Sequence, residues 1–219
     1  MAQGQVLSLF VRLYESSGEE KWLDAAEHTW QSFSQPYSAQ APWSSVVVDD
    51  HLYLEEYAGD QPPLLVLNGQ IFAAFGIYDY WRLTGSDEAR SYLDGAMTTV
   101  LERILPLSRL PGGVSYYCVQ ADYCQIPRWQ NQKYHEIHSW QLDTLQRLTG
   151  DSRFGQWATL LRADWRATRR VESSAETEGM DILDDASQAV YGIYYQDDAE
   201  FPSFEEPVIE TPMSGTEQG

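Results

Sequence analysis

Tyrosine is plentiful in this 219-residue chain, with 14 copies, and several stand beside carboxylate or imidazole groups. These residues form three groups: Glu55-Glu56-Tyr57, Tyr116-Tyr117, and Tyr134-His135 with His138. A phenol has a reference pKa of about 10, so it is a poor base at neutral pH but a competent proton donor. The three groups therefore suit proton transfer. The alternatives stay open: such tyrosines also serve in packing, and histidines three apart at a helix start also serve as capping or core groups.

Two further features of the sequence bear on these groups. A neighbouring cation lowers the pKa of a phenol, and the cationic candidates nearest to Tyr134 are Lys133, His135 and His138. Asn68 stands at the entrance of a predicted helix. It is expected to hydrogen-bond either a substrate or a loop, or else to cap the helix.

An internal repeat predicts the elements that must position these residues. Three segments share one plan, in which an apolar helical stripe ends at a glycine and a second stripe restarts on acidic or capping residues. The stops are Ser16-Ser17-Gly18, Leu83-Thr84-Gly85 and Leu148-Thr149-Gly150, 67 and 65 residues apart. Glycine supplies the positive φ that ends a helix, so each copy is predicted to be a helical hairpin of antiparallel neighbours.

Two segments between the hairpins, 35–65 and 105–134, differ from them in composition. Residues 46–54, with a turn at Asp49-Asp50, predict a β-hairpin, and residues 112–117 predict another strand after a glycine turn. Helical hairpins joined by short β-hairpin excursions suggest a mainly α fold, an incomplete α/α toroid of three helical hairpins. In that fold the connections at one rim carry the chemistry.

The net charge of −19 is unevenly spread along the chain. Residues 1–170 hold 20 acidic and 14 basic residues, a net charge of −6, whereas residues 171–219 hold 13 acidic residues and no Lys or Arg. We therefore predict a domain over 1–170 and an acidic tail over 171–219, with one docked helix at 180–195 and disorder over 197–219. This charge excludes a nucleic-acid binder that relies on counterion release and an amphipathic helix on an anionic membrane.

The cysteines and the N-terminal residues limit the classes of protein that remain. Cys118 and Cys124 are too few for a disulfide framework, leaving either two ordinary small side chains or one local disulfide. No second Cys/His pair stands at zinc-ligand spacing, so no metal site is predicted. The start of the chain has no signal-peptide pattern, and no apolar run nears the roughly 20 residues of a membrane span, so the chain as written is expected in the cytoplasm.

Five motifs in order resemble the C-terminal domain of D-glucuronyl C5-epimerases, enzymes that convert D-glucuronate to L-iduronate within heparan-type polysaccharides. The resemblance covers roughly residues 1–166. The motifs are Met-Ala-Gln-Gly-Gln at 1–5, Glu55-Glu56-Tyr57, Leu67-Asn68-Gly69 with Gly76-Ile77-Tyr78-Asp79, Tyr134-His135-Glu136-Ile137-His138, and Gln141-Leu142.

The resemblance implies a reaction and a set of roles. Epimerisation removes the C5 proton beside a carboxylate and returns one on the other face, so two groups must flank the sugar ring. Glu56 and Tyr134 would be that pair, assisted by Tyr57 and Tyr116 around the sugar carboxylate. The residues implied for substrate binding are Asn68, Lys133, His135 and His138. The substrate would be a glucuronate-containing polysaccharide, and no cofactor is implied.

The chain departs from the family pattern in three places, one of which is Asn131-Gln132-Lys133, where the family has aromatic or acidic residues before the tyrosine. The family has a basic residue after the tyrosine of the second group, where this chain has Cys118-Val119, and Arg109 or Arg128 is the candidate replacement. Family members also carry β-rich N-terminal domains, which a separate subunit or a homo-oligomer would have to supply. The alternatives are a non-catalytic helical module that binds a glycan or a protein, and a toroid glycosidase or lyase with Asp122 and Glu136 as paired carboxylates.

Overall fold

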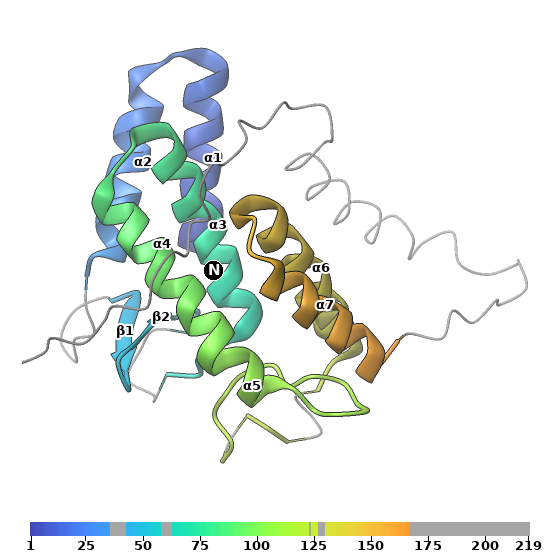
Figure 1. Cartoon of the computed structure of the whole chain (residues 1–219). Helices are drawn as coiled ribbons and strands as arrows, with labels where there is room; N and C mark the ends of the chain where they lie inside the picture. The colour runs from blue at the N-terminus through green and yellow to red at the C-terminus, as the bar shows by residue number, and fades with distance from the viewer. Residues whose placement is uncertain (36–42, 58–62, 123, 127–129, 167–219) are drawn as a thin grey trace, which may run out of the picture. The chain divides into compact units, whose positions relative to one another are not determined.

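The computed structural model describes residues 1–35, 43–57, 63–122, 124–126 and 130–166, and these are mainly helical, as the sequence predicts. The elements are α1 (Ala2–Ser17), α2 (Glu20–Phe33), β1 (Ser45–Val48), β2 (His51–Leu54), α3 (Leu67–Thr84), α4 (Asp87–Thr99), the π-helical segment η1 (Val100–Ile104), α5 (Leu105–Ser108), α6 (Gln132–Thr149) and α7 (Ser152–Asp164). Figure 1 shows α3 lying among α1, α4 and α6.

The three helical hairpins are present and turn at the glycines that the repeat marks. Gly18, Gly85 and Gly150 have φ of 67°, 68° and 73°, the left-handed conformation in which a helix ends. The second helix of two pairs restarts on a side-chain cap. Ser86 accepts from the amide of Ala89 at 3.2 Å, and Asp151 accepts from the amide of Arg153 at 2.9 Å. Closure of these hairpins into a toroid stays a prediction.

The predicted β-hairpin is confirmed. β1 and β2 pair antiparallel with Val48 opposite His51, so only Asp49 and Asp50 form the turn. Both have positive φ, 49° and 61°, as a two-residue type I′ turn requires. Gln70 on α3 ties β2 to the helices, because its side chain accepts from the Leu54 amide at 2.6 Å and donates to the Leu52 carbonyl at 3.1 Å.

The predicted strand over 112–117 is wrong. None of residues 112–117 belongs to a strand. One isolated bridge, between Val66 and Cys118, follows directly after them. The reason is that its donors bond to helical elements. The amide of Ser115 donates to His135 Nδ1 at 2.9 Å, and that of Tyr116 donates to the Ser108 carbonyl at 2.8 Å. The segment is therefore an irregular connection that is fixed to α5 and α6.

Helices α1 and α3 cross in very close contact. A Cβ added at Gly4 would fall 2.5 Å from the Cα of Ala73, and one at Gly76 would overlap the Gly4 carbonyl. One turn further along, Ser8 and Arg12 both donate to Asp79 Oδ2, Arg12 at 3.3 Å. The motifs at 1–5 and 76–79 therefore build this crossing.

Two expectations fall on the remainder of the chain. The domain boundary at 170 and the tail over 171–219, with its helix at 180–195 and disorder over 197–219, lie outside the described residues. Within the described part, no helix combines the length and the apolarity that crossing a membrane requires.

Candidate active site

Glu55 anchors the loop that follows β2. Its side chain is only 3% exposed, and its carboxylate accepts from the amides of Glu56 at 3.0 Å, Tyr57 at 2.9 Å and Leu65 at 3.1 Å. Leu65 holds a positive φ of 57°, an uncommon conformation for a bulky residue. Three charge-assisted bonds to backbone thus fix the conformation in which Glu56 and Tyr57 are presented.

Glu56 lies over the first turn of α3, where Gly69 leaves the space for it. A Cβ at Gly69 would fall 2.5 Å from Glu56 Oε2. The same oxygen accepts from the hydroxyl of Tyr117 at 3.3 Å. The glycine of the Asn68-Gly69 motif therefore leaves the space in which this carboxylate lies, at the positive end of the α3 dipole.

The tyrosines extend from Glu56 in two directions. The hydroxyl oxygens of Tyr57 and Tyr117 are 3.2 Å apart, and because Tyr117 donates to Glu56, Tyr57 is the donor to Tyr117. The Tyr117 ring meets the Tyr134 ring edge to face, with centroids 4.7 Å apart. Tyr57 is 52% exposed and Tyr117 only 5%, so the hydrogen-bonded chain leads from solvent to a half-buried carboxylate.

Burial sets the protonation of this group, which we call the Glu56 cluster (Glu56, Tyr57, Tyr117 and Tyr134). Burial raises the pKa of Glu56, although the amino group at Met1 and the Tyr117 hydroxyl act in the opposite direction. Burial, the hydrogen bond with Tyr57 and the charge of Glu56 all raise the pKa of Tyr117. Glu56 is thus a stronger base than a free carboxylate, and Tyr117 stays protonated at neutral pH.

The structure brings together Glu56, Tyr57 and Tyr134 of the expected site residues, but Tyr117 takes the central place, not Tyr116. The two neighbours are distinguished by the bridge of Val66 with Cys118, which sets the register of the segment. The Leu67 amide donates to the Tyr117 carbonyl at 3.2 Å in the same pairing. Residue type alone could not separate two adjacent tyrosines, so sequence reasoning had no signal for this choice.

A disulfide between Cys118 and Cys124 closes the loop directly after Tyr117. Both sulfurs belong to a buried cluster with Val66 and Tyr117, and Tyr134 packs against it. Of the two alternatives for these cysteines, the structure has the local disulfide. It holds in place the segment that carries the central phenol.

His135 and His138 are buried side chains of α6, 1% and 0% exposed. His135 accepts from the Ser115 amide through Nδ1, and its Nε2 lies 3.0 Å from the Leu161 carbonyl, which fits an Nε2–H tautomer. His138 Nδ1 lies 2.9 Å from Ser115 Oγ, and burial lowers its pKa to about 3. Of the two interpretations offered for these histidines, their positions match core groups.

The other residues implied for substrate binding lie at the two helix starts. Lys133 is exposed on the first turn of α6. Asn68 is 2% exposed, and its Oδ1 has no hydrogen-bond partner among the described residues. The capping alternative for Asn68 is wrong, because Val66 is the N-cap of α3 and no side chain caps it.

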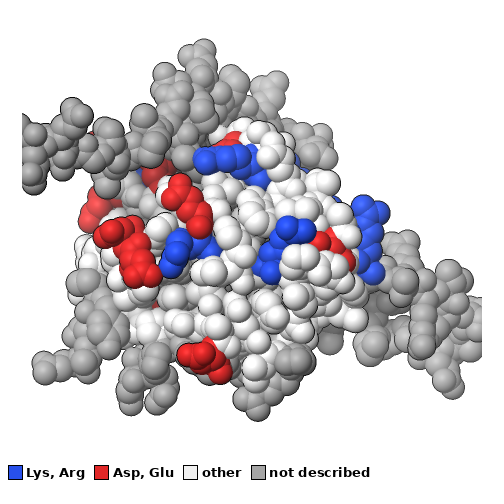
Figure 2. All heavy atoms as spheres, turned by 60° about the horizontal axis from the view of Figure 1, so that its bottom comes forward, with Lys and Arg blue, Asp and Glu red and all other residues white. Residues whose placement is uncertain are grey.

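Charges around the site are mixed. Arg109, a candidate partner for a substrate carboxylate, is held by Asp164 through bonds of 2.6 Å and 3.0 Å, while Arg128 lies outside the described residues. Asp122 and Glu136 are exposed. Figure 2 shows a face on which acidic and basic side chains are interspersed among uncharged residues. Within the described ranges, no group of three or more His, Cys, Asp and Glu side chains is arranged to hold a metal ion.

Fold and site together define a helical domain with a carboxylate–tyrosine cluster at the ends of two helices. The chain matches the family model for the C-terminus of D-glucuronyl C5-epimerase over residues 1–162 and belongs to this family. It is also 29% identical over 153 residues to an uncharacterized protein of Methanocaldococcus jannaschii. That match covers 69% of this chain and 47% of the relative, so the chain spans about half of the relative's length.

Proposed function

We propose that the chain carries the proton-transfer half of a glucuronate C5-epimerase that acts on residues within a polysaccharide. The observation that carries this proposal is the chain of hydroxyls from Tyr57 through Tyr117 to Glu56, with the Tyr134 ring against Tyr117. A half-buried carboxylate whose pKa is raised by burial, in spite of the charge of the Met1 amino group, has the properties of a base for a weakly acidic C–H bond.

In the proposed reaction the C5–H bond of D-glucuronate breaks and its proton passes to Glu56. The electron pair delocalises into the sugar carboxylate, and the Tyr117 phenol donates a hydrogen bond to the charge that develops there. Tyr134 then gives its phenolic proton to C5 from the opposite face. Its phenolate takes a proton from water, and Glu56 releases the abstracted C5 proton to water, which restores both groups. The product is L-iduronate, and the reverse reaction exchanges the two roles.

Two structural aspects belong to the proposal. The three hairpins would form one arc of an α/α toroid, with the Glu56 cluster at its rim. Because the chain spans about half of its relative, a further polypeptide segment, a β-rich subunit or a second copy would supply the other wall of the cleft. His135 and His138 hold Ser115 and the connection that leads to Tyr117, so we assign them no contact with the sugar.

The test is C5 proton exchange. A glucuronate polymer is incubated in heavy water with the chain, alone or with a polypeptide supplying the family's β-rich region, and C5 deuterium is measured by NMR. Glu56→Gln and Tyr117→Phe are each expected to lower exchange about 10²-fold or more. The matched controls, Glu136→Gln on the exposed face of α6 and the neighbouring Tyr116→Phe, should retain it. Absence of exchange in every combination would contradict the proposal.

A non-catalytic glycan-binding module is the second candidate, and it is favoured by the share of the relative that the chain covers. A half cleft can hold a polymer without completing two-sided proton transfer. Binding of the polymer that persists in Glu56→Gln, together with no C5 deuterium in the unmodified chain, would support this candidate over the first.

A further inference from the structure

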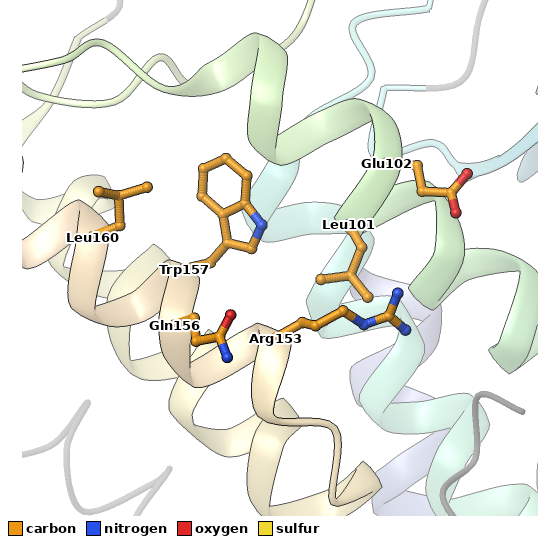
Figure 3. A pocket seen from close by; sticks show the side chains of 6 residues that line it. All are labelled: Leu101, Glu102, Arg153, Gln156, Trp157 and Leu160. Atoms are coloured by element: carbon orange, nitrogen blue, oxygen red, sulfur yellow. The ribbon is translucent and has the colours of Figure 1, made fainter.

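A pocket of about 350 Å³ lies between η1 and α7, lined by residues that do not belong to the Glu56 cluster. Its lining residues are Leu101, Glu102, Arg153, Gln156, Trp157 and Leu160. In Figure 3, Trp157 and Leu101 face each other across the pocket from α7 and η1, and Arg153 extends from α7 towards η1. Its volume falls in the range of small-molecule sites.

The π-helical turn shapes one wall of this pocket. Residues 100–104 form the only π-helical segment in the described ranges, and two of its five residues, Leu101 and Glu102, line the pocket. A π-turn widens the helix and changes the direction of its side chains, and such turns are frequent at functional sites. Glu102 is thereby presented beside an apolar wall, with its side chain 57% exposed.

The opposite wall is held in position by an ion pair. The Arg153 guanidinium donates to Asp151 from Nε at 2.9 Å and from Nη2, and the Asp151 carboxylate also caps α7. Asp151 therefore neutralises Arg153 and fixes its direction. The other polar groups of the pocket are the Gln156 amide, which is exposed, and the Glu102 carboxylate, which lies 3.7 Å from His51 Nε2 and whose charge also acts on Arg153.

These walls define the chemistry of a ligand. The half-buried indole of Trp157, with Leu101 and Leu160, suits a flat apolar face. The Glu102 carboxylate accepts only, so it needs hydroxyl or amide donors, and Gln156 can both donate and accept. Glu102 repels an anion, because the charge of Arg153 is already balanced by Asp151. A neutral pyranose, with a face of C–H groups and a rim of hydroxyls, meets all these requirements.

We propose that this pocket is a second carbohydrate subsite, which binds a neutral pyranose and not a uronate. It stands apart from the proposed proton transfer, because neither its residues nor its ligand involve the Glu56 cluster. On a polymer that contains neutral sugars, such a subsite would hold the chain at a unit other than the one that reacts.

The test compares two ligands that differ only at C6. Methyl β-D-glucoside and methyl β-D-glucuronide are titrated against the full chain by ligand-observed NMR, and the glucoside is expected to saturate with a Kd of about 1–10 mM. Trp157→Ala should weaken glucoside binding at least tenfold, and Gln156→Ala at least threefold. Trp22→Ala, which removes a half-buried indole from α2, should leave glucoside binding unchanged, as should Glu56→Gln.

Three results would overturn the proposal: no saturable glucoside binding up to 100 mM, equal glucoside affinity in Trp157→Ala, or Trp157-dependent binding that favours the glucuronide. Gln156 is exposed, so its variant tests the pocket even if Trp157→Ala fails to fold, and equal glucoside affinity in Gln156→Ala would then overturn the proposal. Because Glu56→Gln abolishes the proposed exchange but should not alter glucoside binding, failure of one proposal is distinguishable from failure of the other.

Discussion

The crossing of α1 with α3 and the Glu56 cluster both contain a carboxylate whose pKa is raised by burial, yet the two carboxylates have different partners. Asp79 accepts from Ser8 and from the guanidinium of Arg12. Glu56 accepts from a phenol. A carboxylate hydrogen-bonded by a guanidinium and a hydroxyl is committed to the structure, whereas one hydrogen-bonded by a phenol, on which the Met1 amino group acts only through its charge, can accept a proton. The hydrogen-bond partner, more than burial, therefore distinguishes the structural carboxylate Asp79 from Glu56, the proposed base.

The glycines of the two regions also differ in what they make room for. Gly76 makes room for backbone, since an added Cβ would overlap the carbonyl of Gly4. Gly69 makes room for a side chain, since an added Cβ would meet the Glu56 carboxylate at 2.5 Å. Backbone cannot yield without moving a helix, whereas the Glu56 side chain can shift, its Cβ included, which would lie 3.1 Å from the added methyl. Replacing glycine with alanine should therefore destabilise the fold at position 76 but mainly displace a side chain at position 69.

Gly76→Ala is expected to have the largest effect, because α1 must move away from α3 and the buried contacts of the crossing are lost. We expect a loss of stability of more than about 3 kcal/mol, or no folded protein. Thermal unfolding followed by circular dichroism measures this. Gly95→Ala on α4 is the control, since its Cβ would meet Leu52 at an ordinary 3.4 Å, and it should gain up to about 1 kcal/mol from helix propensity.

An unchanged melting temperature for Gly76→Ala would show that the two helices are not as tightly apposed as the structure has them. A large loss in Gly95→Ala would show that any added methyl on these helices is harmful, and the comparison between backbone and side-chain neighbours would then fail.

Gly69→Ala should keep the fold and displace the carboxylate. Stability is expected to change by less than about 1 kcal/mol, because helix propensity offsets the shift of Glu56. C5 exchange should fall by about 10–10²-fold, since the base is no longer held in place. NMR titration gives an independent readout, in which the pKa of Glu56 falls towards that of a solvated carboxyl. A Glu56 pKa that stays raised in Gly69→Ala would mean that Gly69 does not determine the position of the Glu56 carboxylate.

Local pattern predicted the parts of the fold that are formed locally. Apolar periodicity and the glycines at 18, 85 and 150 were sufficient for the three hairpins, and two aspartates between short apolar runs were sufficient for the β-hairpin. The strand over 112–117 failed because its amides bond to His135 and to the Ser108 carbonyl, partners that are 20 residues and 8 residues away in sequence. Long-range bonds of this kind leave no periodic signal.

The same limit applies to the site. Motifs predicted Glu56, Tyr57 and Tyr134, which the structure brings together, whereas the choice of Tyr117 for the candidate site required the bridge between Val66 and Cys118. The π-turn at 100–104 carries no marker in the sequence, and the pocket beside it was not predicted. Motif matching thus located the segments of the site, and only tertiary contacts chose between neighbouring residues within one segment.

A further prediction concerns the buried side chain of His138, whose Nδ1 lies 2.9 Å from Ser115 Oγ. Burial lowers the pKa of His138 to about 3, with the nearby His135 adding to the effect, whereas an unfolded histidine titrates near 6.5. A depressed pKa contributes stability that is present above about pH 6.5 and is lost as the pH falls. At pH 5 the loss from this group should be about 2 kcal/mol.

Urea unfolding at pH 7 and pH 5 measures this loss, and His138→Gln should reduce the difference between the two pH values by about that amount. His28→Gln, on the exposed face of α2, is the matched control and should leave the difference unchanged. Equal pH dependence in His138→Gln and in the unmodified chain would mean that His138 is protonated in the fold. A reduced difference would instead show that His138 stays neutral in the fold at pH 5, so that Ser115, and with it the connection that leads to Tyr117, is held by an uncharged imidazole.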